Sequence, residues 1–398
     1  MFFMTHADLD GLRSASARYQ ANMTALRLLH DLTAQQRDPQ SLTRAEQQTL
    51  ARYTAFGEAA VLNRVFTESR ANDPYGVPTR GGAVVPTAEL AAVTNEVEQA
   101  SIKRTALTAF YTPPDIVGAI WSAMLRLGLG RVECPRILEP AAGTGNFISL
   151  MPDEIRKRAV IDAVEIDPVS ARIVGMLHPD VRVWQQGFQE VAFPADYFDL
   201  VISNVPFSDV GVVDQRMPKA FLTRTLHDYF FAKAVQVVRP GGIVAFLTSY
   251  GTMDKQDTRV RSWLAHQARL LGAFRLPQGV FGDVAGTESG TDLLILQRYP
   301  AAETDRDMTW ITADRVDLPT MGNGSGRTTG SRIHGSGNAR LSQYWADHPS
   351  HVIGRMGQML RYGSFYLVVE PPDAGIAGTL NERLETLPRD VIPPAEEL

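Results

Sequence analysis

Residues 137–148, ILEPAAGTGNFI, decide the fold, because they join a short apolar run to a helix start through a glycine-bearing turn. Gly143 and Gly145 lack a Cβ atom, so the backbone here can approach a ligand closely. A phosphate-binding loop would offer bare amides or basic side chains, whereas this run ends on the acidic Glu139. No Gly-Lys-Ser/Thr follows, which excludes a nucleotide-triphosphate loop. The stretch therefore predicts a strand–loop–helix unit whose ligand carries positive charge.

Outward from this stretch, β-rich runs alternate with helical stretches from about residue 108 onward. This alternation predicts an α/β fold with a mainly parallel sheet and helices on both of its faces. Sheets of this kind bind ligands at the carboxyl ends of their strands. The β-rich runs are 136–140, 159–167, 181–186, 198–204, 242–249, 270–277 and 292–299. Helices are expected at 114–128, 169–177, 227–238 and 255–269.

Glu165 is the second acid that points to a ligand. It ends the run AVIDAVEID and lies 22 residues after Gly143. An acid about 20 residues beyond a glycine loop can accept hydrogen bonds from the two hydroxyls of a ribose. The alternative is a surface acid that caps the next helix, but Asp167, directly before Pro168, is the better candidate for that cap. We therefore expect Glu165 to hold a ribose.

A cationic ligand with a ribose matches S-adenosylmethionine, which carries ribose, adenine, an ammonium and a sulfonium. NAD also carries ribose, but its pyrophosphate would favour a loop with three glycines.

Residues 202–209, ISNVPFSD, end another apolar run with an amide, a turn and an aromatic ring. The exocyclic amino group of a base is a poor nucleophile, because its lone pair is delocalised into the ring. Two acceptors on its N–H groups would position it and stabilise developing positive charge. The Asn204 side chain and the Val205 carbonyl before Pro206 are two such acceptors, and Phe207 offers a stacking face. A base inside a duplex would have to be flipped out to reach them.

Taken together, these motifs resemble the amino-methylating DNA methyltransferases, in the adenine-N6 group with this motif order. AFYTPPDIV (109–117) is similar to the cofactor motif that precedes the glycine loop in that group, and SNVPF is similar to its catalytic Asn-Pro-Pro-Phe/Tyr. The stretches 42–57 and 273–298 are most similar to the methylase portion of phage and plasmid methylase–helicase proteins. The resemblance implies a class I S-adenosylmethionine-dependent methyltransferase fold with a Rossmann-like, mainly parallel seven-stranded sheet.

The resemblance also implies roles for individual residues. The methionine part of the cofactor would be lined by Tyr111, Thr112, Glu139, Ala141 and Gly143. Its ribose and adenine would be held by Glu165, Ile166, Gln186 and Phe188. The catalytic turn would be Asn204, Val205, Pro206 and Phe207. Phe274 would pack against the other side of the target base or, equally well, belong to the core.

Two positions depart from the family pattern. Val205 replaces the first proline of the catalytic turn, which keeps the backbone carbonyl but removes the rigidity of a ring. Gln186 and Gly187 stand where an acid usually accepts a hydrogen bond from the adenine amino group. Gln186 could accept that hydrogen bond instead, and the affinity for the cofactor would then be lower.

Three regions are expected along the 398 residues: a helical N-terminal region at 1–107, the catalytic domain at 108–300, and a small C-terminal region at 301–398. The C-terminal region contains the Gly/Ser-rich loop 321–338 and leaves little room for a target-recognition domain. Sequence specificity would then come from the N-terminal region or from a helicase or specificity partner protein. No apolar run is long enough to span a membrane. The single cysteine excludes a disulfide and a cysteine-built zinc cluster, no metal site is expected, and a cytoplasmic protein is the expectation.

DNA is the expected substrate, within a restriction-modification context. The net charge of −5 does not by itself indicate nucleic-acid binding and does not exclude it. Basic residues gather at 216–224 and again at 255–269, and either cluster taken alone favours an ordinary surface of mixed charge. Together with the N-terminal helices they mildly favour nucleic acid over a protein substrate. The alternatives are methylation of RNA adenine, methylation of a protein glutamine, or a non-catalytic module that binds cofactor or DNA.

Overall fold

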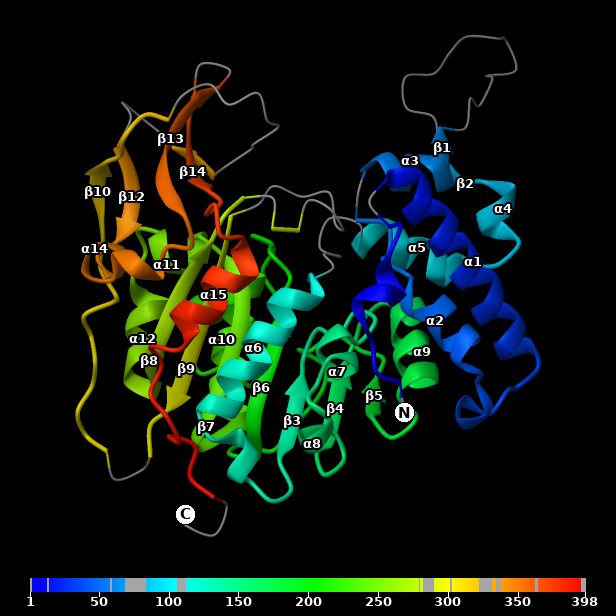
Figure 1. The fold of residues 1–398 in the computed structure, drawn as a ribbon, viewed down its shortest axis with the longest axis horizontal. Helices are drawn as coiled ribbons and strands as arrows, with labels where there is room; N and C mark the ends of the chain where they lie inside the picture. Colours follow the sequence, from blue (N-terminus) through cyan, green and yellow to red (C-terminus); the bar gives the residue numbers. More distant parts are fainter. Residues whose placement is uncertain are drawn as a thin grey trace.

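The structure, a computed structural model, describes residues 2–12, 14–57, 59–68, 84–105, 112–278, 280–281, 290–300, 303–321, 331–333, 338–361 and 364–394. At its centre is a twisted sheet with helices on both faces (Figure 1). Among the described residues this main sheet has seven strands in the order β5-β4-β3-β6-β7-β9-β8. All neighbouring strands are parallel except β9, which runs antiparallel to β7 and β8.

The strands of the main sheet form where buried apolar runs leave no polar face, as is usual in parallel sheets. They are β3 (Arg136–Glu139), β4 (Val160–Val164), β5 (Arg182–Trp184), β6 (Phe198–Asn204), β7 (Val238–Ser249), β8 (Ala268–Leu276) and β9 (Thr291–Arg298). Each of the expected runs forms one of these strands. The topology is that of a class I S-adenosylmethionine-dependent methyltransferase, which confirms the predicted fold class.

Two apolar cores, one on each face, hold the helices to the main sheet. One core joins α6 and α15 to the sheet, and the other joins α10 and α12 to the opposite face. The helices of this part are α6 (Pro114–Arg126), α7 (Asn146–Ser149), α8 (Asp153–Arg156), α9 (Pro168–Leu177), α10 (Leu226–Val237), α11 (Gly251–Asp254) and α12 (Arg259–Gln267). The expected cap of α9 is present, because Asp167 accepts a hydrogen bond from the Ser170 amide at 2.9 Å.

The N-terminal helices lie beside the β5 edge of the main sheet and pack on α9 (Figure 1). They are α1 (Ala15–Ala34), α2 (Arg44–Ala51), α3 (Ala59–Val65), α4 (Ala88–Ala91) and α5 (Glu96–Thr105), with a hairpin of β1 (Phe66–Glu68) and β2 (Val84–Pro86). Thr43 and Glu46 form a capping box at the start of α2. The chain turns between α2 and α3, where Ala55 has a positive φ of 56°.

The C-terminal segment returns to the main sheet. Its elements are β10 (Ala313–Asp317), β11 (Ser331–Ile333), β12 (Asn338–Ser342), α14 (Tyr344–Asp347), β13 (Arg355–Arg361), β14 (Ser364–Glu370) and α15 (Ile376–Leu384). The Tyr344 hydroxyl accepts a hydrogen bond from the Ala273 amide of β8 at 2.9 Å, and α15 packs on α6. Most of the Gly/Ser-rich loop 321–338 lies outside the described residues. Short 3-10 turns lie at His6–Leu9, Pro39–Ser41, Leu129–Arg131, Ala220–Thr223 and Pro349–His351.

Within the described ranges no helix is both long and apolar enough to cross a membrane. Those same ranges contain no group of three or more histidine, cysteine or acidic side chains placed to hold a metal ion.

Candidate functional site

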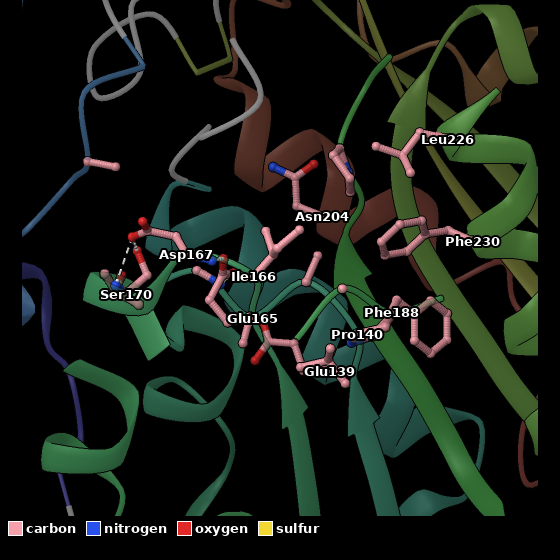
Figure 2. Close-up of a pocket in the computed structure, with 18 of the residues that line it drawn as sticks. Glu139, Pro140, Glu165, Ile166, Asp167, Ser170, Phe188, Asn204, Leu226 and Phe230 are labelled. Carbon is pink, nitrogen blue, oxygen red and sulfur yellow. Dashed lines mark hydrogen bonds between the residues drawn. The ribbon is translucent and has the colours of Figure 1, made fainter. Parts of the chain in front are cut away.

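A cavity of about 410 Å³ opens at the carboxyl ends of β3, β4 and β6, where the sequence predicts the ligand site (Figure 2). Its volume is within the roughly 300–1,000 Å³ that small-molecule sites occupy. Ten of the predicted residues line it: Thr112, Glu139, Ala141, Gly143, Glu165, Ile166, Gln186, Phe188, Asn204 and Pro206. Val205, Phe207 and Phe274 are not among the lining residues, and Tyr111 lies outside the described residues.

The glycine loop forms one wall of the cavity. Gly143 and Gly145 have φ values of 55° and 80°, in the left-handed region that favours glycine. No heavy atom lies within 4 Å of the place where a Cβ of Gly143 would stand. The loop is tied to β4 by a 2.9 Å hydrogen bond from the Ala142 amide to the Val164 carbonyl. Gly143 therefore leaves open space between the backbone and the cavity.

Two carboxyls, the buried Glu139 and the half-buried Glu165, face the ligand space from the ends of β3 and β4. Glu139 is 2% exposed, and its Oε2 has no hydrogen-bond partner among the described residues. Burial, and secondly the Glu165 carboxylate, raise the pKa of Glu139 well above its usual range. An unsatisfied buried carboxyl of this kind is costly, so a donor or cation from a ligand would stabilise it.

Glu165 is already partly engaged by the backbone. Its Oε2 accepts a hydrogen bond from the Gly143 amide and its Oε1 from the Asp167 amide, each at 2.7 Å. Burial and the neighbouring Asp167 carboxylate raise the pKa of Glu165 to about 7, although these amide bonds oppose the rise. Each carboxylate oxygen has a second lone pair, so Glu165 can still accept hydrogen bonds from a ligand. The carboxyl is thereby held in one orientation.

An apolar slot lies beside these acids. Ile166 is 43% exposed, unusual for a large aliphatic residue, and lines the cavity together with the buried Phe188. The Lys233 ammonium lies 4.5 Å from the Phe188 ring centroid and donates to the Phe188 carbonyl, which fixes the position of Phe188. Gln186 is exposed on the rim of the cavity. A flat heterocycle would fit between the side chains of Ile166 and Phe188, with Gln186 beside it.

Asn204 ends β6 at the wall of the same cavity. Its Nδ2 donates to the Thr112 hydroxyl at 3.1 Å, which couples the predicted catalytic turn to the predicted first cofactor motif. The Val205 amide continues the pairing of β6 with β7 by donating to the Leu247 carbonyl at 3.1 Å. Val205 is 1% exposed and packs in the apolar core with α10. The turn is therefore anchored by a hydrogen bond and by burial, where the family pattern has a proline ring.

Phe274 does not reach the cavity. It is fully buried in β8 and stacks on the His351 ring, with 4.5 Å between centroids. The sequence left two roles open for Phe274, contact with the target base or packing in the core. The structure places it in the core. The C-terminal segment supplies His351, so Phe274 is covered by a part of the chain distant in sequence.

Sequence reasoning missed four residues from the N-terminal helices. Tyr53, Thr54, Ala55 and Arg104 also line the cavity. The turn at 53–55 is held by Asn22 of α1, which accepts from the Thr54 amide at 2.8 Å and donates to the Ala55 carbonyl at 2.5 Å. Asn22 is fully buried, so a polar residue among the apolar residues of a helix was an available signal.

The basic residues at 255–269 are mostly neutralised locally. Lys255, Arg259 and Arg269 pair with Asp228, Asp257 and Glu303. Arg261 is fully buried and donates to backbone carbonyls. In the cluster at 216–224, Arg216 pairs with Asp214 at 2.8 Å, whereas Lys219 and Arg224 are exposed and have no acidic partner among the described residues.

No protein-family model matches the chain. The Defense against restriction protein B of Escherichia phage P1 is 31% identical over 204 residues, which cover 50% of this chain and 9% of that protein. The tRNA1(Val) (adenine(37)-N6)-methyltransferase of Serratia proteamaculans is 28% identical and covers 43% of this chain and 66% of its own length. The type I restriction enzyme EcoEI methylase subunit of Escherichia coli is 23% identical and covers 45% of this chain and 41% of itself.

The topology is that of the class I methyltransferases, whose methyl donor is S-adenosylmethionine, and two of these relatives are named as a methyltransferase and a methylase subunit. The predicted resemblance to restriction-modification and adenine-N6 methyltransferases, with a phage protein among the relatives, is confirmed. The chain spans less than two thirds of each of the three relatives.

Proposed function

We propose that this protein transfers a methyl group from S-adenosylmethionine to the N6 amino group of adenine in DNA. The observation that carries the proposal is the place of Asn204, which lies at the end of β6 on the wall of the cavity that Glu139 and Glu165 also line. An amide acceptor for an amino group and two acids for a cationic nucleoside thus share one site. An amino group held beside the cofactor would react as if at a high local concentration.

The cofactor fits the residues present. Glu139, with its unsatisfied oxygen, would face the cationic methionine part, and Glu165 would accept from the ribose hydroxyls. Ile166, Phe188 and Gln186 would hold the adenine of the cofactor. When bound, S-adenosylmethionine supplies an electrophilic methyl group.

The chain's own part in the reaction would be to hold the target amino group. The Asn204 side-chain carbonyl and the Val205 backbone carbonyl would accept its two N–H groups and stabilise the positive charge that develops on nitrogen. The bond from Asn204 Nδ2 to Thr112 holds the amide in a defined orientation. Phe207 would stack on the target base.

A duplex substrate would require the base to be flipped out of the helix. Lys219 and Arg224, on the segment that follows the catalytic turn, are free to contact phosphates, because no acid among the described residues neutralises them. Sequence specificity would come from the N-terminal region or from a helicase or specificity partner protein. A cytoplasmic location is part of the same proposal.

RNA adenine is the second candidate substrate, because one relative is named a tRNA adenine-N6-methyltransferase. The proposed contacts of Asn204 and Val205 are to the adenine amino group, which DNA and RNA share. Methylation of a protein glutamine, or cofactor binding without catalysis, would leave both nucleic acids unlabelled.

The experiment is a transfer assay with labelled S-adenosylmethionine and three acceptors: unmethylated DNA, total RNA and a protein extract. We expect label in DNA, recovered as N6-methyladenine after digestion. Asn204→Ala should lower the rate at least about 100-fold, as the loss of one charge-stabilising contact does in other enzymes, while cofactor affinity changes less than about threefold. Label in RNA or protein alone would contradict the proposed substrate. A collapse of cofactor binding in Asn204→Ala would contradict the role of Asn204.

A further inference from the structure

The cavity wall carries more acidic than basic side chains. Among the described residues that line it, Glu139, Glu165 and Asp167 are acidic, and Arg104 is the one basic residue. The three acids suit the ammonium and sulfonium of S-adenosylmethionine. None of them suits the carboxylate of its methionine part, because an acid offers that group no positive charge and repels it when ionised. The motif residues that line the cavity therefore supply no cationic contact for this carboxylate.

Arg104 lies near the end of α5, on the N-terminal side of the cavity. Its side chain is exposed to the cavity space and pairs with no acid among the described residues. A guanidinium presents two parallel N–H groups in the geometry that a carboxylate accepts. Arg104 is thus available for a carboxylate ligand.

The position of α5 is fixed relative to the ligand loops. Arg172 of α9 forms an ion pair with Glu98 of α5, whose side chain is only 6% exposed. Helix α9 begins directly after Asp167, which is itself on the cavity wall. Ile102 of α5 is also buried in the core that the N-terminal helices share with α9. The helix that carries Arg104 is therefore held to the same element that positions Glu165 and Asp167.

We propose that Arg104 binds the carboxylate of the methionine part of S-adenosylmethionine, so that the N-terminal helical region completes the cofactor site. The inference rests on the cofactor and not on the proposed DNA substrate. Contact with a nucleic-acid phosphate is the competing role for Arg104, and it predicts no effect on cofactor binding in the absence of nucleic acid.

The test compares two ligands by calorimetry without DNA. S-adenosylhomocysteine carries the amino-acid part, whereas 5′-methylthioadenosine has the same adenine, ribose and thioether but no carboxylate. Arg104→Gln should weaken binding of S-adenosylhomocysteine about 10–100-fold, the range for loss of a charged hydrogen-bond pair. Its affinity for 5′-methylthioadenosine should stay within about twofold, which also shows that the cavity remains folded. Arg104→Lys should give an intermediate loss.

Lys103→Gln is the matched control, because it removes the same charge from the next position of α5. The Lys103 ammonium lies 4.6 Å from the Phe66 ring centroid and Lys103 does not line the cavity. Both ligands should bind this variant as they bind the original protein. Equal weakening of both ligands by Arg104→Gln, or no weakening of either, would overturn the inference. The result does not depend on whether DNA is the methyl acceptor.

Discussion

Val205 stands where the catalytic turns of the resembled family have a proline. A proline restricts φ but cannot donate a hydrogen bond, whereas the Val205 amide donates to Leu247 and its side chain is buried. The expected loss of rigidity is thus offset by a strand hydrogen bond, worth about 1 kcal/mol in typical proteins, and by apolar packing. The sequence pattern shows that the proline is absent. It does not show what stabilises the turn instead, because the hydrogen bond is made to Leu247, which is distant in sequence.

Residues at strand ends were predictable, because a parallel sheet brings the carboxyl ends of its strands to one edge. Glu139, Glu165 and Asn204 come together for this reason. Arg104 and the turn at Tyr53 were not predictable in this way, since the placement of the N-terminal helices depends on packing against α9. For Phe274 the sequence could not decide between the target base and the core. Its burial depends on the His351 ring, which is distant in sequence.

Glu165 predicts a pH dependence of ribose binding. Its pKa is raised to about 7, so the neutral acid predominates below that pH and the carboxylate above it. The carboxylate is the better acceptor for ribose hydroxyls, so a proton on Glu165 competes with the ligand. We expect the affinity for 5′-methylthioadenosine, which lacks the α-amino and carboxyl groups of the methionine part, to rise as pH increases from 6 to 8. Calorimetry across this range would measure the rise, and its steepest part should approach about tenfold per pH unit.

Glu165→Gln is the control, because an amide does not titrate in this range. Its affinity should be low and flat with pH. Asp167→Asn should shift the midpoint of the original protein's pH profile downward, because the Asp167 carboxylate is the second cause of the raised Glu165 pKa. An unchanged slope in Glu165→Gln would assign the titration to another group, of which Glu139 is the nearest candidate.

At the scale of elements, helix starts and buried strands follow from local chemistry, whereas helix breaks do not. The predicted cap at Asp167 is present, and Thr43 and Glu46 form a capping box at the start of α2. The break after α2 was missed, because Leu50, Tyr53 and Phe56 keep a helical spacing through the turn and are all buried. The buried Asn22 satisfies the backbone of that turn from another helix.

Thr43→Ala tests the contribution of this cap. The Thr43 hydroxyl accepts from the Glu46 amide at 3.3 Å, and Glu46 accepts from the Thr43 amide at 2.8 Å. Loss of the hydroxyl should lower the free energy of unfolding by about 1 kcal/mol, measured by urea denaturation. Thr43→Ser keeps the hydroxyl and should be close to the original protein. Equal destabilisation by both substitutions would show that the methyl group, not the cap, is what matters.

At the scale of the whole molecule, the packing of the C-terminal segment against the main sheet could not be predicted from local sequence patterns. Arg275 of β8 is fully buried and pairs with Asp292 of β9 and with Asp254 of α11. Its guanidinium lies 4.2 Å from the ring centroid of Trp345, in α14. Charged residues in a core are stable only when paired in this way, and here the partners come from three elements. The sequence shows an arginine in a strand but not the residues that make its burial possible.

Helix α15 links the C-terminal segment to the catalytic core. Leu380 and Leu384 are buried in the same apolar core as α6 and the main sheet, and the Ile392 amide donates to the Leu127 carbonyl after α6. The Arg126 side chain donates to the Leu387 carbonyl at 2.6 Å. These contacts favour a single cooperative unit over a separately folding C-terminal region.

Leu380→Ala distinguishes the two arrangements. Loss of a fully buried leucine should lower the free energy of unfolding by about 2–5 kcal/mol. If α15 and the sheet unfold together, far-UV and near-UV circular dichroism will report one coincident transition, shifted to lower urea as a whole. A separate C-terminal unit would instead melt early in the variant while the near-UV signal of the sheet kept its original midpoint. Glu382→Ala, on the exposed side of the same helix, should shift neither transition, because its 3.3 Å pair with Arg383 is a surface contact of little energetic weight.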